Sequence, residues 1–227
     1  MERLQPHPAR RMHGAPLTEF VWFPRSLLSA LADEGRLHEP EETGGILVGH
    51  YTVTKSNGTR DAVITDVIGP GPAATRSRVS FEPDTAWQAT ELARIYAERD
   101  RRVSYLGDWH THPTAQPIPS FRDLETLGVI AAYSPARCPE PLMAILGKEA
   151  PGQNWKIAVC QHVAAGQIRQ IAPHLMPEAS QEQAAPIIDC EHSQARPRSG
   201  AVTAGRVPHP TQHHGCSMSS SEAKQQG

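Results

Sequence analysis

Two histidines, a serine and an aspartate lie close together in the stretch GDWHTHPTAQPIPSFRD, residues 107 to 123. Zinc binds imidazole nitrogen and carboxylate oxygen well, and three protein ligands leave its fourth position open to water. His110, His112 and Asp123 are candidates for such a set. Because zinc lowers the pKa of a bound water to about 7, this set would suit hydrolysis at neutral pH.

The same stretch has a purely structural interpretation. Ser120 and Asp123 stand three residues apart before an apolar run, which is the spacing of a capping-box variant at a helix start. A pair of histidines in a loop is also more often a surface feature than a metal site. The two interpretations are compatible, because residues that begin a helix can also serve a metal.

The elements around these residues can bring them together. Residues 103–110 read as a strand, and on an extended backbone residues i and i+2 point to the same side. The imidazoles of His110 and His112 can therefore converge on one point. Asp123 lies in the first turn of the helix predicted over residues 120–133.

The rest of the central region alternates between strand and helix patterns. Apolar, β-branched runs predict strands, Asn57-Gly58 predicts a hairpin turn, and Asp84 predicts a helix cap. The predicted strands are residues 18–23, 44–53, 61–68, 103–110, 141–147, 155–161 and 167–172. The predicted helices are residues 25–35, ended by Gly35, 85–100 and 120–133. We therefore expect an α/β fold, a mixed sheet with helices on its faces.

Composition divides the chain of 227 residues into three parts. Residues 16–173 form one predicted domain, and residues 1–15 a flexible N-terminal arm. From Met176 onward there is no Phe, Trp, Tyr or Leu. Such a segment cannot bury enough apolar area to offset the entropy of ordering it, so residues 174–227 are predicted to be a disordered, low-complexity tail.

Charge and cysteine spacing exclude several classes of protein. The formal net charge is −2, which predicts neither a nucleic-acid partner nor a membrane surface. The four cysteines are far apart and lack the C-x-x-C spacing of a zinc ribbon. The N-terminal residues have no apolar core of a signal peptide, and no stretch is long enough to span a membrane. The chain is expected to be soluble and cytoplasmic.

Two motifs make the sequence resemble a known family. The pattern H-x-H-x(7)-S-x-x-D from His110 to Asp123 is similar to the signature of the JAMM (JAB/MPN+) zinc metalloproteases. ETGGILVG at residues 42–49 matches the family's E-x-G-G-x-L-x-G segment. The resemblance covers about residues 17 to 147 and is strongest to the prokaryotic JAB branch. It implies the JAB/MPN fold, which is related to the cytidine-deaminase-like sandwich.

The resemblance implies a role for each of five residues. One zinc ion per chain would be bound by His110, His112 and Asp123. Glu42 would be the general base and then the general acid. Ser120 would donate a hydrogen bond to the oxyanion of the tetrahedral intermediate.

The implied activity is that of a zinc metallopeptidase or isopeptidase. It would hydrolyse an amide bond at the C-terminus of a ubiquitin-like or conjugated protein. Members of the prokaryotic branch are often paired with ubiquitin-activating-like and conjugating-like enzymes, including in antiphage CBASS operons. Three alternatives stay open: a hydrolase that releases cysteine from a small sulfur-carrier protein, a non-catalytic MPN scaffold, and a zinc deaminase. The last is disfavoured because its H-x-E and P-C-x-x-C pairing is absent.

Other residues that could do chemistry have simpler interpretations. Glu39 and Glu41 are out of the E-x-G-G register and fit a solvated acidic loop. Trp109 is equally consistent with a core position and with the wall of a cleft. The histidines of the tail could bind metal adventitiously: His209, His213 and His214.

Overall fold

A mixed β-sheet of eight strands forms the centre of the computed structural model, which describes residues 16–150, 152–163 and 166–176. In sheet order the strands are β10 (Pro173–Leu175), β1 (Leu17–Phe23), β3 (Thr59–Ile68), β2 (Gly44–Tyr51), β6 (Ser104–His112), β7 (Leu142–Gly147), β8 (Lys156–Val163) and β9 (Gln167–Ile171). A separate hairpin pairs β4 (Thr75–Ser77) with β5 (Ser80–Glu82). The helices are α1 (Arg25–His38), α2 (Thr85–Glu98), α3 (Phe121–Ala132) and a short 3-10 turn (Ser134–Ala136).

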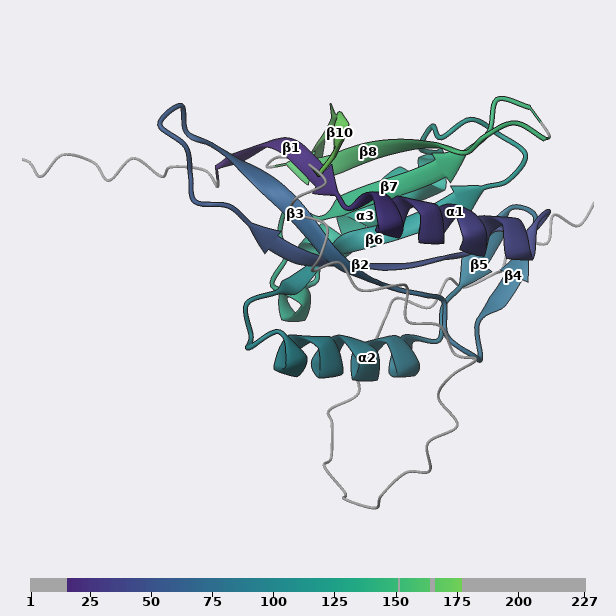
Figure 1. The fold of residues 1–227 in the computed structure, drawn as a ribbon, viewed down its shortest axis with the longest axis horizontal. Helices are drawn as coiled ribbons and strands as arrows, with labels where there is room; N and C mark the ends of the chain where they lie inside the picture. Colours follow the sequence, from purple (N-terminus) through teal and green to yellow (C-terminus); the bar gives the residue numbers. More distant parts are fainter. Residues whose placement is uncertain (1–15, 151, 164–165, 177–227) are drawn as a thin grey trace, which may run out of the picture.

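Helices cover both faces of the sheet, and Figure 1 shows α1 on the near side with α2 below. On β7, Leu142, Ala144 and Leu146 pack in the cluster that contains the apolar face of α1. The alternate residues Met143 and Ile145 pack against α3 instead. A third cluster joins β2 and β3 to α2. Because side chains of a strand alternate between faces, α1 lies opposite α2 and α3.

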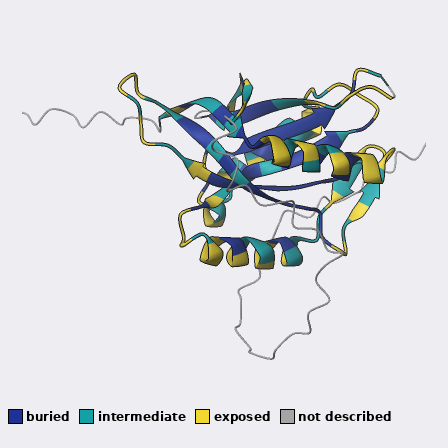
Figure 2. Ribbon diagram, in the orientation of Figure 1, coloured by how far each residue is buried: buried dark blue, intermediate teal, exposed yellow. Residues whose placement is uncertain are grey.

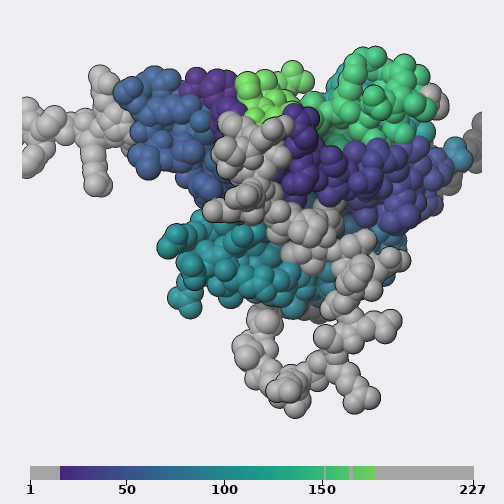
Figure 3. Space-filling model, in the orientation of Figure 1, coloured from purple at the N-terminus to yellow at the C-terminus, as the bar shows by residue number. Residues whose placement is uncertain are grey.

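Burial follows these layers. In Figure 2 the strands are mostly buried, while the outward faces of α1 and α2 are exposed. The space-filling view shows α1, coloured dark purple, covering part of the sheet on this face (Figure 3). The site described below lies on the opposite face of the sheet, where α3 packs.

The predicted α/β class is confirmed, and most predicted elements appear. Gly58 has a positive φ of 80° in the predicted Asn-Gly turn, and Asp84 caps α2 by accepting a hydrogen bond from the Trp87 amide. The prediction that Gly35 ends the first helix is wrong, because α1 continues to His38. Gly35 is buried, and a Cβ there would lie 2.8 Å from the Trp155 ring. Close packing against the sheet, and not a helix end, explains this glycine.

Two parts of the structure have no counterpart in the sequence prediction. The β4–β5 hairpin was not predicted, and neither was β10, which pairs in parallel with β1. β10 begins at residue 173, the predicted end of the domain, and extends the sheet to Leu175. The predicted arm and nearly all of the predicted tail lie outside the described residues, as do the three tail histidines. Within the described part of the chain, no helix has the length and apolar character needed to cross a membrane.

Candidate metal centre

The two histidines lie at the end of β6, on the face that α3 covers. Trp109 and Thr111 point to the α1 side, where Trp109 is fully buried in the core. His110 and His112 alternate with them and point the other way. Their Nε2 atoms are 3.1 Å apart. The i, i+2 spacing therefore brings both imidazoles to one point, as predicted.

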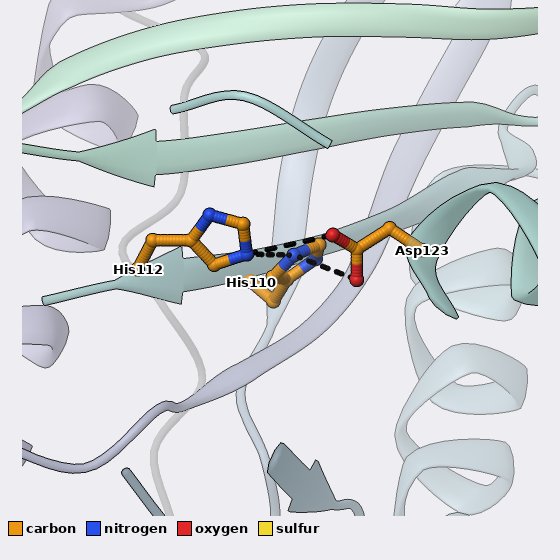
Figure 4. A group of neighbouring side chains, drawn as sticks. All are labelled: His110, His112 and Asp123. Atoms are coloured by element: carbon orange, nitrogen blue, oxygen red, sulfur yellow. Dashed lines mark hydrogen bonds and ion pairs between the residues drawn. The ribbon is translucent and has the colours of Figure 1, made fainter. Parts of the chain in front are cut away.

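The start of α3 supplies the third residue. Ser120 is the N-cap: its hydroxyl accepts a hydrogen bond from the Asp123 amide, and the Asp123 carboxylate accepts one from the Ser120 amide. This reciprocal pair confirms the capping box. It also fixes the direction of Asp123, whose carboxylate points at both histidines (Figure 4). One pair of residues thus begins the helix and orients a potential ligand.

The distances between the three side chains fit a metal ion. The potential ligand atoms of His110, His112 and Asp123 all lie within 4.8 Å of one another. Asp123 oxygens are 3.3 Å from His110 Nε2 and 3.5 Å from His112 Nε2. Two ligand atoms that each lie about 2.1 Å from a tetrahedral zinc ion would be about 3.4 Å apart. The donor set therefore has the chemistry and the spacing that a zinc ion bound by three protein ligands would need.

The charges of these groups are strongly coupled. Burial favours the neutral form of Asp123, but hydrogen bonds from His110 and His112 outweigh it and hold the pKa of the carboxyl well below its usual range. Burial also disfavours the charged form of His112, but its contacts with Asp123 and the charge of Glu42 outweigh this and raise the pKa of the imidazole.

This coupling predicts opposite pH dependence for the metal-free and zinc-loaded protein. The raised pKa of His112 stabilises the metal-free fold below the ordinary value of 6.5, and this is lost as the pH rises through the raised pKa. The lowered pKa of Asp123 contributes stability above its ordinary value of 3.8, lost only as the pH falls. Zinc needs neutral imidazoles, so its stabilisation grows as the pH rises. Thermal melts from about pH 5 to about pH 8 measure both slopes. Slopes of the same sign with and without zinc would contradict the assignment.

Glu42 approaches the same point from the strand beside β6. Gly44 on β2 pairs with His110, and the Thr111 amide donates to the Thr43 carbonyl at 2.8 Å, which continues the register by one residue. The next step of this register sets Glu42 opposite His112, and opposed residues share a face of the sheet. The Glu42 amide is held by the Ser77 carbonyl of β4 at 2.8 Å. Burial raises the pKa of the Glu42 carboxyl, although the neighbouring histidines oppose this.

Two glycines after Glu42 allow this close approach. A Cβ on Gly44 would lie 2.4 Å from the Trp109 carbonyl oxygen, and one on Gly45 would lie 1.9 Å from the Ile68 carbonyl oxygen. Neither backbone atom can move without disrupting the sheet. Close packing against the backbones of β6 and β3 therefore requires glycine at both positions.

A groove of about 1090 Å³ contains all five predicted residues. It runs between the β4–β5 hairpin, the end of β6, residues 113–118 and α3. Exposed apolar side chains and two arginines contribute to its lining: Val79, Ile118, Val129, Arg78 and Arg122. These residues have no chemical motif that the sequence could reveal, since their position depends on the unpredicted hairpin and on the loop after His112.

The remaining candidate residues serve other purposes. Glu39 pairs with the buried Lys148, and Glu41 is exposed. The Trp109 ring belongs to the core, where its Nε1 donates to the Ile68 carbonyl at 3.1 Å. Trp109 is therefore a core residue, and it is also one of the residues that line the groove.

Comparison with known proteins gives a consistent assignment. Residues 24–158 match the family described as prokaryotic homologs of the JAB domain. The chain is similar to a "Probable metalloprotease y4qB" of Sinorhizobium fredii, with 39% identity over 143 residues, 61% of this chain and 81% of that protein. It is also similar to a "CD-NTase/cGAS isopeptidase" of Enterobacter hormaechei, with 35% identity over 114 residues, 49% of this chain and 58% of that protein.

A solved structure supports the fold alone. The solution structure of protein DSY2949 from Desulfitobacterium hafniense superposes with a TM-score of 0.53 at 17% identity, covering 73% of this chain and 99% of that one. The family match, in contrast, spans more than half of this chain and includes both motifs. The chain belongs to the family of prokaryotic JAB-domain homologues, the prokaryotic branch of the JAMM proteins.

Proposed function

We propose that this protein is a zinc-dependent metallopeptidase of the isopeptidase type. Its reaction would be hydrolysis of an amide bond at the C-terminus of a ubiquitin-like or otherwise conjugated protein. The observation that carries the proposal is the convergence of three ligand atoms within 4.8 Å of one another, in a groove that Glu42 also lines. The names of the similar proteins, a metalloprotease and an isopeptidase, support a hydrolase of this kind.

Each residue of the site has a distinct task. A bound zinc ion would act as a Lewis acid and lower the pKa of a water molecule at its open position. His110, His112 and Asp123 would hold the ion, and the capping box keeps Asp123 in place. The Glu42 carboxylate accepts no hydrogen bond from the described residues, so it can accept a proton from the attacking water. Its raised pKa makes it a stronger base than an ordinary glutamate.

The proton that Glu42 accepts from the water is used again in the second half of the reaction. Water oxygen bonds to the carbonyl carbon, and Glu42 passes its proton to the leaving nitrogen as the C–N bond breaks. Ser120 Oγ accepts from the Asp123 amide, while its hydroxyl proton has no acceptor among the residues that the structure describes. That proton can be donated to the oxyanion of the tetrahedral intermediate. One such donor contributes about 10²- to 10³-fold to turnover.

The shape of the groove favours an extended polypeptide as the substrate. Its volume of about 1090 Å³ is at the upper end of the range of about 300 to 1,000 Å³ for small-molecule pockets, so a segment of extended chain has room in it. The outer edge of β5 has no strand partner among the described residues, so an extended tail can pair with it through main-chain hydrogen bonds. The exposed side chains of Val79 and Ile118 provide apolar contacts along this path.

The proposed partners follow from the relatives. The isopeptidase relative is named for CD-NTase/cGAS, which supports a conjugated protein as the substrate class. The chain spans 58% of that relative's length, so its target is carried over only as a proposal. We further propose that ubiquitin-activating-like and conjugating-like enzymes attach the modifier in the cytoplasm, and that the system serves antiviral defence.

The test uses a defined conjugate. A ubiquitin-like protein joined through its C-terminus to a lysine of a CD-NTase is incubated with the zinc-loaded protein, and products are identified by mass spectrometry. We expect release of the intact modifier, blocked by a chelator and restored by zinc. A short peptide extension and a C-terminal cysteine are tested in parallel on the same modifier. Cleavage of the cysteine derivative alone would favour the sulfur-carrier reaction, and no cleavage of any substrate would favour a scaffold.

A further inference from the structure

Two buried threonines join the segment that carries Glu42 to the strand that carries the metal ligands. Thr43 and Thr111 are both fully buried. The Thr43 amide donates to the Thr111 hydroxyl oxygen at 3.0 Å, and that hydroxyl donates to the Thr43 carbonyl at 3.4 Å. Together with the backbone bond from the Thr111 amide, three hydrogen bonds connect these residues across 68 positions of sequence.

Thr43 is fixed from two further elements. Its hydroxyl donates to Glu34 Oε1 on α1 at 3.2 Å, and Arg76 Nε of β4 donates to that hydroxyl at 3.4 Å. Glu34 is itself buried and contacts His38 Nε2 at 3.1 Å. The buried Glu34 of α1 thus accepts a hydrogen bond from Thr43, the residue next to Glu42. Buried polar groups require such partners, because each one left unsatisfied costs stability.

The position of these two threonines in the chain indicates what the network does. Thr111 stands between His110 and His112, and Thr43 follows Glu42 directly. The two side chains face the α1 side, so they contact neither substrate nor metal. They connect the segment of the proposed general base to the strand of the proposed metal ligands, and a general base must lie within about 2.6 to 3.2 Å of the atom whose proton it takes.

We infer that Thr111 is a positioning residue for Glu42 in the proposed hydrolysis. Its hydroxyl takes the place of a main-chain acceptor for the Thr43 amide, just before β2 begins. It thereby holds Glu42 beside β6, the strand that carries the two histidines. This inference rests on the proposed function, and it goes further by assigning a role to a residue outside the metal and acid–base set.

The test replaces the hydroxyl without changing the shape of the side chain. In Thr111→Val the β-branched form suited to a strand remains, but the Thr43 amide loses its acceptor. We expect kcat on the conjugate to fall about 10- to 100-fold, because a misplaced base loses part of the about 10²- to 10⁴-fold that general acid–base catalysis supplies, with KM and zinc content unchanged. Thr111→Ser keeps the hydroxyl and should restore kcat to within about threefold of wild type.

Two controls separate positioning from general destabilisation. Thr18 is also fully buried and shares a hydrogen bond with Gln161 at 3.0 Å, on β1 away from the groove. Thr18→Val should lower the melting temperature while leaving kcat unchanged. In the second control, Thr111→Val is added to Glu42→Gln. If Thr111 acts through Glu42, the double variant should be no slower than Glu42→Gln alone.

A structural readout is independent of turnover. Amide hydrogen exchange at Thr43 should accelerate in Thr111→Val and remain slow in Thr111→Ser. Faster exchange together with wild-type kcat in Thr111→Val would overturn the inference while leaving the proposed function intact. Loss of zinc from Thr111→Val, or an additive effect in the double variant, would also overturn it. Absence of hydrolysis by the wild type on every substrate would instead refute the proposed function.

Discussion

Zinc content should fall from about one ion per chain to nearly none when His112 or Asp123 is replaced by alanine. Each substitution leaves two protein ligands, one fewer than the three that catalytic zinc sites have. Asp123→Ala also removes the acceptor for the Ser120 amide, so the helix start weakens with the site. Elemental analysis of tag-free protein measures the zinc. The melting temperature should fall as well, because an ion that binds only the folded state stabilises it.

A matched histidine makes the comparison specific. His50 is exposed on β2, outside the groove, so His50→Ala should keep full zinc content and the wild-type melting temperature. Equal zinc in the wild type, His112→Ala and Asp123→Ala would eliminate the metal centre. Loss of zinc from His50→Ala would show that binding is adventitious.

Turnover should fall by about 10²- to 10⁴-fold in Glu42→Gln, the range typical of losing a general acid–base group. The amide has nearly the shape of the carboxylate but cannot take a proton from water. Because Glu42 is not one of the clustered ligands, zinc content should stay at the wild-type value. Single-turnover assays on the conjugate measure the effect.

The neighbouring glutamate is the control. Glu41 is exposed and precedes Glu42 by one residue, so Glu41→Gln should have wild-type turnover. Normal turnover in Glu42→Gln combined with loss in Glu41→Gln would show that the general base was assigned to the wrong residue. Loss of zinc from Glu42→Gln would mean that Glu42 is a ligand.

Local patterns were enough to predict much of this site. The alternation of strand side chains brought His110 and His112 to one side, and the S-x-x-D spacing placed Asp123 at a helix start. The structure confirms both, because they depend on geometry within a few residues. The capping box is the link between them: it satisfies the helix start and also turns Asp123 toward the histidines.

The pairing of strands that are far apart in the sequence could not be predicted from the residues alone. The approach of Glu42 to His112 depends on β2 pairing with β6, and only the resemblance to a family anticipated it. Gly35 was assigned to a helix end because glycine often has that role, whereas here packing against Trp155 requires it. The β4–β5 hairpin is short and largely polar, so it lacks the apolar alternation by which strands are recognised. It nevertheless holds the Glu42 amide and forms one wall of the groove.

The most direct test of zinc-assisted amide hydrolysis at this site is cleavage of the conjugate in ¹⁸O-labelled water. If water attacks the amide carbon with Glu42 as the base, the new C-terminal carboxylate of the released modifier should carry one ¹⁸O atom. Labelled product should form with zinc-loaded wild type, and should be nearly absent after chelation and in Glu42→Gln. An unlabelled product would contradict attack by water. Labelled product formed equally by the wild type, the chelated protein and Glu42→Gln would contradict the role assigned to this metal centre.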